Sequence, residues 1–422
     1  DTSATPAEVH TLSDRTADSY NIDFSTNNAV LTGAYTDFIS AGNASNTTDF
    51  DEVIAHTASV PITLSGVTLN DSSVQNPDLN RLFAQAEGAV TVTITDNTES
   101  VLGDTLTISS DDKVTINFGT KTATDSIISA INALAQQSGL TNITGTLNDV
   151  TASMVGDLHA DLDSGNSTIN FNMATDSTGL LSVSAANGLL SHTDTSNATV
   201  NFGGGISDAL SAYAESGDTK STIDAIVTED TDVAVTVTGT LGSSSQDITD
   251  LNAIASKFQE TGLTATITAT VSTAKANLYN SDTSQAILST DTTDTIAISV
   301  SDALSPSEWA AIKAKTGSTV TASAGFSGAL SEYATGGNTT TNWNNAVGAP
   351  NASAAVTVTG TLGSGDITNL NALASDADHS GAITASVSAQ LSQYGVGTLA
   401  ITSSDSDAVE VTDALTNANL AD

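Results

Sequence analysis

The chain has 422 residues, 48 acidic side chains against 9 Lys and Arg, and a formal net charge of −39. This balance argues against a nucleic-acid partner, because phosphate binding needs basic patches. The absence of cysteine excludes disulfides, thiolate catalysis and cysteine-bound metals. No apolar run reaches the length of a membrane span, so we expect no membrane insertion.

Residues 1–59 lack the periodic pattern of the rest of the chain. They hold a Thr- and Asn-rich segment at 40–48 and several aromatic side chains. We interpret them as an N-terminal cap or as an assembly arm that packs on a neighbouring molecule.

From residue 60 onward, the sequence predicts repeated strand–helix units. Strict alternation of apolar residues with Thr or Ser gives each strand one buried face. Short links favour parallel strands joined by right-handed crossovers. The expected fold is α/β and β-rich: an elongated, irregular repeat array of strand–helix units with parallel strands, similar to a β/α solenoid. The expected strands are 62–69, 89–95, 114–118, 168–173, 234–238, 263–271, 296–300, 320–324, 355–359 and 383–387.

One long segment occurs twice. Residues 235–243 return almost letter for letter at 356–364, and 247–256 returns at 366–375. Similar units that stack side by side bury a shared core that no single unit could bury. We therefore expect a first repeat region, 60–232, and a second, 233–422, with copies starting near 235 and 356.

Expected helices are marked by caps and by a recurring asparagine. Asn76 with Pro77 is typical of a helix start, and Ser305 with Glu308 forms a capping box. The asparagine is either a solvated helix residue or a residue that bonds to the backbone of the neighbouring unit. It occurs between apolar residues as Asn80, Asn132, Asn252 and Asn371.

Residues 376–383 match the first eight positions of a calcium-binding EF-hand loop. Asp376, Asp378 and Ser380 would supply oxygen ligands, and Gly381 stands at the sharp turn. The position of the bidentate Glu is Val387 instead. The earlier copy of this segment has the same length without such ligands, so the alternative is an ordinary turn that ends a helix.

Acidic residues gather just before expected strands. If the strands stack in parallel, these loops line one edge of the sheet, where carboxylates repel unless a cation bridges them. Calcium takes oxygen ligands and is the cofactor that we predict; the alternative is that the loops are simply polar. Besides the loop at 376–383, the candidate ligands are Asp111, Asp112, Asp161, Asp163, Asp230, Asp232, Asp291, Asp294, Asp405 and Asp407.

Motifs for catalysis are absent from the sequence. The five histidines lie far apart along the chain, and no zinc-protease helix, nucleophile elbow or phosphate loop occurs. With 48 acids available, no single carboxylate pair for glycoside cleavage is informative. We predict that the protein is not an enzyme.

The segments 236–272 and 298–323 resemble the Thr-, Ala- and Asp-rich repeats of giant secreted surface proteins and surface-layer proteins of marine bacteria, cyanobacteria among them. The resemblance covers residues 60–422 and is one of repeat style, without a diagnostic motif. It implies an extracellular, calcium-stabilised and self-associating role, and it supplies no site residues.

The predicted function is that of an extracellular structural protein, a self-assembling surface-layer or filament subunit stabilised by calcium. Its expected partner is itself, with cell-surface polysaccharide as a further candidate, and open strand edges are the expected joins. One alternative is a carbohydrate- or host-binding adhesin or fibre shaft, which the 4% aromatic content disfavours. The other is a polysaccharide-active solenoid enzyme, which needs carboxylates that converge in one groove.

Overall fold

The computed structural model describes residues 3–14, 29–42, 45–55, 59–69, 72–96, 106–260, 262–348, 350–389, 405 and 408–411. The chain forms two compact units. Unit 1 comprises Asp1–Ile206 and Ala225–Val233, and unit 2 comprises Ser207–Asp224 and Ala234–Asp422.

Unit 1 contains a parallel sheet whose strands follow one another in chain order, β1-β2-β5-β7-β8-β9-β10-β11, with β6 paired to β7. A short antiparallel hairpin, β3–β4, lies outside it. The strands are β1 (Ser3–Ala4), β2 (Val30–Gly33), β3 (Ile39–Ser40), β4 (Ser45–Asn46), β5 (Ile62–Leu64), β6 (Val67–Leu69), β7 (Val90–Asp96), β8 (Lys113–Thr122), β9 (Leu140–Val150), β10 (Ser167–Met173) and β11 (Val200–Asn201).

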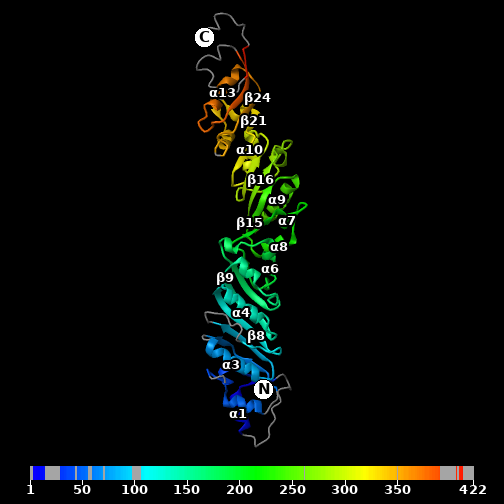
Figure 1. The fold of residues 1–422 in the computed structure, drawn as a ribbon, viewed down its shortest axis with the longest axis vertical. Coiled ribbons are helices and arrows are strands. Elements are labelled where there is room, and N and C mark those ends of the chain that lie inside the picture. The colour runs from blue at the N-terminus through cyan, green and yellow to red at the C-terminus, as the bar shows by residue number, and fades with distance from the viewer. Residues whose placement is uncertain are drawn as a thin grey trace. The chain divides into compact units, whose positions relative to one another are not determined.

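Helices connect the strands of unit 1. The helix α4 (Asp125–Ala135) begins where the Thr124 hydroxyl accepts the backbone N–H of Ile127. It buries Ile128, Ile131 and Leu134 and lies beside β8 and β9 in Figure 1. The remaining helices are α1 (Pro6–Ser13), η1 (Tyr35–Asp37), α2 (Thr48–Ala55), α3 (Ser72–Gln85), α5 (Ala152–Gly156), η2 (Ser177–Gly179) and α6 (Val183–Leu190).

Unit 2 carries two further sheets, ordered β12-β15-β16-β19-β20 and β21-β24-β25-β26. An isolated parallel bridge pairs Leu304, in the connection after β19, with Phe326 at the start of β21. The strands are β12 (Ile206–Ala209), β15 (Ala234–Leu241), β16 (Thr266–Thr273), β19 (Thr295–Val300), β20 (Val320–Ala322), β21 (Phe326–Ala329), β24 (Val356–Leu362), β25 (Ile383–Ala389) and β26 (Ala408–Val411).

Short antiparallel hairpins and helices link these strands. The hairpins are β13 (Ala214–Glu215) with β14 (Asp218–Thr219), β17 (Tyr279–Asn280) with β18 (Gln285–Ala286), and β22 (Ala334–Thr335) with β23 (Asn338–Thr339). The helices are α7 (Leu210–Tyr213), α8 (Ser221–Glu229, which belongs to unit 1 from Ala225 onward), α9 (Ser245–Phe258), η3 (Lys275–Asn277), α10 (Pro306–Lys313), α11 (Leu330–Tyr333), α12 (Thr341–Ala346), η4 (Ser364–Asp366) and α13 (Ile367–Ala374). Within the described ranges, no helix is both long and apolar enough to cross a membrane.

The sheets have two unlike faces. Right-handed crossovers between strands added in chain order place the connecting helices on one face. That face is apolar, as in Val90, Val92 and Ile94 of β7, which are at most 4% exposed. The other face carries polar side chains such as Thr91 and Thr93, which are exposed. We call it the open face: the outward alternate positions of β7, β8, β9, β10, β15, β16, β19, β24 and β25.

The α/β architecture with parallel strands is confirmed, and strands are found at all ten expected places. The segment expected as one strand at 62–69 is divided into β5 and β6, which both pair with β7. The sequence pattern does not predict β9, the longest described strand at 11 residues. Its alternation is interrupted by Gly145, where a Cβ atom would overlap the ring of Phe118 on β8. Packing against that ring favours glycine over a strand-forming residue.

The N-terminal segment also extends the sheet of unit 1. β1 pairs in parallel with β2, and β2 pairs in parallel with β5. The described part of residues 1–59 therefore supplies two strands of the same sheet as the periodic region. These strands have only two and four residues, which is too short for an alternation pattern to be visible in the sequence.

The strands of the two long sequence copies adopt the same local structure, whereas the helix that follows has 14 residues in the first copy and 8 in the second. β15 and β24 each carry a β-bulge, with register shifts between Thr236 and Thr240 and between Thr357 and Thr361. The bulges contain Gly239 and Gly360, with φ of 84° and 88°. Glycine adopts this left-handed backbone without the steric cost of a Cβ atom.

We expect Gly360→Ala to lower the free energy of unfolding by about 1–2 kcal/mol, the cost of a left-handed backbone for an L side chain. A Cβ atom at Gly360 would meet nothing within 4 Å, so the loss comes from the backbone alone. Urea unfolding followed by circular dichroism measures it. The matched control is Gly365→Ala, which also enters open space but at a glycine without positive φ. Equal losses in the two variants would contradict this explanation.

Candidate functional site

The predicted acidic clusters contain carboxylates that bond to the preceding strand of the sheet. Asp112, Asp230 and Asp294 are 5–6% exposed, and Asp405 is half-buried. One oxygen of each accepts a backbone N–H at or beside a strand. The bonds run from Val90 N to Asp112 Oδ1 (2.8 Å), Phe202 N to Asp230 Oδ2 (2.6 Å), Ile267 N to Asp294 Oδ1 (2.9 Å) and Ile383 N to Asp405 Oδ1 (3.0 Å).

The second oxygen of three of these carboxylates closes the local turn. Asp112 Oδ2 accepts the N–H of Ser109 at 2.9 Å. Asp294 Oδ2 accepts the N–H of Asp291 at 3.1 Å, and Asp230 Oδ1 accepts that of Asp232 at 3.3 Å. Each of the three carboxylates therefore joins its own turn to the neighbouring strand, a use of both oxygens that the sequence analysis did not anticipate.

Neutral side chains make equivalent bonds elsewhere. The Thr193 hydroxyl accepts the N–H of Ile169 at 3.0 Å and donates to its carbonyl at 2.8 Å. Thr316 bonds in the same way to Ile296, at 3.0 and 2.7 Å. Both threonines are at most 1% exposed. These two threonines could not be predicted as strand partners from the sequence, because a single Thr before a strand is not distinctive in a Thr-rich chain.

The side-chain amide of Asn351 makes the two hydrogen bonds that the backbone of a neighbouring strand would make. Its Oδ1 accepts the N–H of Ala322 at 3.0 Å, and its Nδ2 donates to the carbonyl of Val320 at 2.9 Å. Nδ2 also lies 3.1 Å from the carbonyl oxygen of Ala346, and the residue is 2% exposed. In a parallel sheet, one residue of a neighbouring strand bonds to the carbonyl of a residue and to the N–H two residues later. The Asn351 amide bonds to the same two groups, the Val320 carbonyl and the Ala322 N–H.

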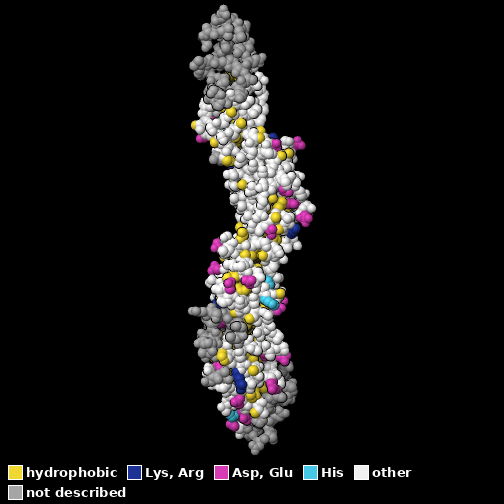
Figure 2. All heavy atoms as spheres, viewed as in Figure 1, with side chains coloured by type: hydrophobic (Ala, Val, Ile, Leu, Met, Phe, Trp, Pro, Cys, Tyr) yellow, Lys and Arg dark blue, Asp and Glu magenta, His cyan; other side chains and the backbone are white. Residues whose placement is uncertain are grey.

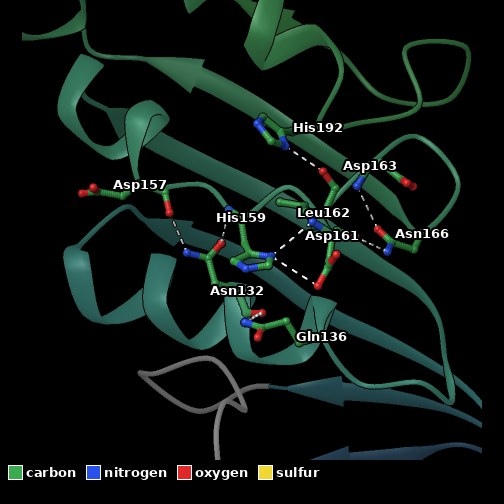
Figure 3. Close-up of polar contacts among 9 residues, drawn as sticks. All are labelled: Asn132, Gln136, Asp157, His159, Asp161, Leu162, Asp163, Asn166 and His192. Atoms are coloured by element: carbon green, nitrogen blue, oxygen red, sulfur yellow. Dashed lines mark hydrogen bonds and ion pairs between the residues drawn. The ribbon is translucent and has the colours of Figure 1, made fainter. Parts of the chain in front are cut away.

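The recurring helix asparagines bond to the backbone of the following connection. In Figure 3, Asn132 of α4 donates to the carbonyl of Asp157 at 2.7 Å and accepts the N–H of His159 at 2.9 Å. Asn252 of α9 makes the same pair of bonds to Ile287 and Ser289. Asn80 accepts the N–H of Thr107 at 2.7 Å. Of the two interpretations, the backbone-bonding one is confirmed for these three residues.

The other predicted acidic ligands lie on the surface or close turns. Asp111 and Asp232 are exposed. Asp163 Oδ1 accepts the N–H of Gly165 at 2.7 Å, and Asp161 lies 3.3 Å from His159 Nδ1 (Figure 3). Asp291 bonds to the N–H and hydroxyl of Thr293, which lowers its pKa. Asp407 lies outside the described residues.

The loop at 376–383 uses its oxygens within the fold. Asp376 Oδ2 accepts the indole N–H of Trp343 at 2.7 Å, and its Oδ1 accepts the N–H of Asp378 at 3.1 Å. Ser380 donates to the carbonyl of Ala352 at 3.2 Å, and Asp378 is exposed. The structure thus gives Asp376 and Ser380 partners in the neighbouring connection.

The predicted ligands are brought together only in local pairs, such as Asp291 with Asp294. Among the residues that the structure describes, no group of three or more His, Asp or Glu side chains is placed to hold a metal ion. Two hollows of about 440 Å³ lie beside α9. One is lined in part by Gln259, Thr266, Asp291 and Asp294. Neither brings a histidine to a carboxylate.

Burial affects the titration of the bridging acids. It raises the pKa of Asp294, and it raises that of Asp230 to about 6 together with a hydrogen bond to Asp232. Ionised carboxylates are favoured by N–H donors and disfavoured by loss of solvent. For Asp230 and Asp294, loss of solvent is the larger effect.

Comparison of the chain with protein-family models, with curated proteins and with solved structures found no match.

We expect Asn351→Ala to lower the free energy of unfolding by about 2–4 kcal/mol, since it leaves buried backbone groups without partners. The matched control is Asn345→Ala, which removes an exposed asparagine of the adjacent helix α12. Chemical denaturation of both variants measures the difference. Similar unfolding midpoints for the two would contradict a supporting role for the Asn351 amide.

The raised pKa of Asp230 predicts a pH-dependent loss of stability. The folded chain binds more protons than the unfolded chain between the ordinary value of 3.8 and about 6, so stability falls as pH rises through this interval. Removing the neighbouring carboxylate with Asp232→Asn should raise the melting temperature at pH 7.5 and leave it unchanged near pH 4.

Thermal unfolding in a chelating buffer, followed by circular dichroism, tests this expectation. Asp218→Asn removes the same charge from an exposed hairpin and serves as the control. A gain for Asp232→Asn that is equal at both pH values would show that Asp230 does not cause the effect.

Proposed function

We propose that the chain is an extracellular structural protein, a self-assembling subunit of a surface layer or filament that calcium stabilises. The observation that carries the proposal is the set of side-chain bonds between successive strands. Buried acids, amides and hydroxyls that could perform chemistry are engaged in holding parallel strands together, as Asp112, Thr193 and Asn351 show. This is the arrangement expected of a scaffold.

The described histidines support the same conclusion. His192 Nδ1 bonds to the carbonyl of Leu162 at 2.6 Å (Figure 3), and His379 Nε2 bonds to that of Ala354 at 2.9 Å. His159 Nδ1 accepts the N–H of Asp161, and His10 pairs with Asp49 at 2.5 Å. The imidazoles of His10, His192 and His379 each join two segments that lie far apart in the chain, and that of His159 closes a local turn.

Charge supports calcium and an extracellular location. Acidic side chains are scattered over the face drawn in Figure 2, with few Lys and Arg among them. A net charge of −39 must be screened by salt or bound cations before copies can associate. The exposed carboxylates Asp111, Asp161, Asp163 and Asp232 are candidates for shared calcium contacts. The absence of cysteine and the need to screen this charge fit a protein secreted into saline water. Cell-surface polysaccharide is its proposed second partner.

Sedimentation velocity and electron microscopy of the purified chain test the proposal. At low salt, we expect calcium to produce large assemblies and a chelator to disperse them and to lower the melting temperature. Sodium chloride at matched ionic strength separates screening from calcium binding, and magnesium tests the preference for a larger ion. A chain that stays monomeric in every condition, with a melting temperature indifferent to chelator, would disprove the proposal.

A further inference from the structure

In unit 2 the open face, on β15, β16, β19, β24 and β25, carries no charged side chain. On the neighbouring strand β26, Glu410 stands opposite Ser388. The outward positions of the open face carry only Thr, Ser or Ala, and most of them are exposed. In the drawn view, the surface over β15 and β16 is mainly uncharged (Figure 2). The positions are Ala234, Thr236, Thr238, Thr240, Thr266, Thr268, Thr270, Ser272, Thr295, Ala297, Ser299, Thr357, Thr359, Thr361, Thr384, Ser386 and Ser388.

These side chains lie in register on neighbouring strands and form rows across the sheet. Thr236 stands opposite Thr268, which stands opposite Thr295. In the second sheet, Thr357 stands opposite Thr384. Small β-branched side chains in register give a level surface, and they lose little side-chain entropy when they are covered.

Such a surface is unusual for parallel strands. All-parallel sheets almost always have both faces covered, and here helices cover only one. At a strand spacing of about 4.8 Å and a rise of about 3.3 Å per residue, the open face on β15, β16 and β19 presents about 350 Å². The open face on β24 and β25 adds about 220 Å². Together they present about 570 Å², close to the roughly 600 Å² per partner at which small, transient interfaces end and standard ones begin.

We propose that the open face of unit 2 is the surface by which two copies of this chain associate, face to face. This inference rests on the proposed self-assembly and identifies the surface responsible. A second copy brings the same large negative charge, so contact through any acidic surface opposes carboxylates to carboxylates. The open face presents hydroxyl and methyl groups to an identical set, which avoids that repulsion. A sugar polymer fits this face less well, because the face lacks aromatic rings for stacking.

The test introduces charge at the centre of the face, and an uncharged variant of the same shape controls for the loss of the β-branched side chain. Thr268→Asp with Thr270→Asp places two carboxylates on β16, and Thr268→Asn with Thr270→Asn is the uncharged control of equal size. We expect the Asp pair to raise the concentration needed for half-assembly at least about tenfold, since like charges across an interface cost several kcal/mol. The Asn pair should stay close to wild type. Sedimentation velocity measures assembly, and circular dichroism checks folding.

The outcomes separate this inference from the function on which it rests. If wild type never assembles, both fail. If wild type assembles and the Asp pair assembles equally well, the open face is not the interface and only this inference fails. If the Asp pair does not fold, Thr359→Asp against Thr359→Asn repeats the comparison on β24.

A binding assay tests the other occupant. Microcrystalline cellulose serves as a neutral polysaccharide, and the fraction of protein that sediments with it is measured for wild type and both β16 pairs. Retention that the Asp pair loses, while its self-assembly stays at the wild-type level, would assign the face to polysaccharide and overturn the proposal. If all three chains sediment with cellulose to the same extent and only the Asp pair loses self-assembly, the result supports the proposal that two copies associate through this face.

Discussion

The structure depends on one requirement: backbone N–H groups at the strands of a one-layer parallel sheet must find acceptors. Where the neighbouring connection is still a loop, a backbone carbonyl is not in position, and a buried N–H without a partner is costly. Side chains supply the acceptor instead. A carboxylate, a hydroxyl and an amide each accept such an N–H, in Asp112, Thr193 and Asn351.

This requirement explains how an acidic chain can bury carboxylates. Asp294 gains backbone N–H donors on both oxygens and loses solvent, and its raised pKa records that solvent loss is the larger effect. A threonine or asparagine at the same place carries no charge and avoids this cost. Because some of these positions carry Thr or Asn, only a few of them have the desolvation cost of a buried carboxylate. Most of the remaining negative charge comes from exposed acids.

The two faces of the sheet differ in residue type because one packs against helices and the other contacts water. The covered face needs apolar side chains against the helices, and small ones such as Ala269 and Ala385 suffice in a thin core. The open face needs residues that favour strands and tolerate water, and threonine meets both conditions. Assembly through this face would use a surface that the fold already provides, with calcium reducing repulsion between the acidic loops.

Ten strand positions, the parallel arrangement and the repeated units could be predicted from residue order alone, because two-residue alternation, helix caps and short links are local signals. The strand β9, which Gly145 interrupts, and the short strands β1 and β2 could not. The sequence also indicated that asparagines such as Asn132 and Asn252 could be structural. Which polar side chains bond within the fold became clear only from the three-dimensional arrangement of the strands. Asp230 and Asp232 look alike in the sequence, yet one is 6% exposed and bonded to Phe202 while the other is exposed. That difference depends on where the preceding strand lies, which no local pattern of residues specifies.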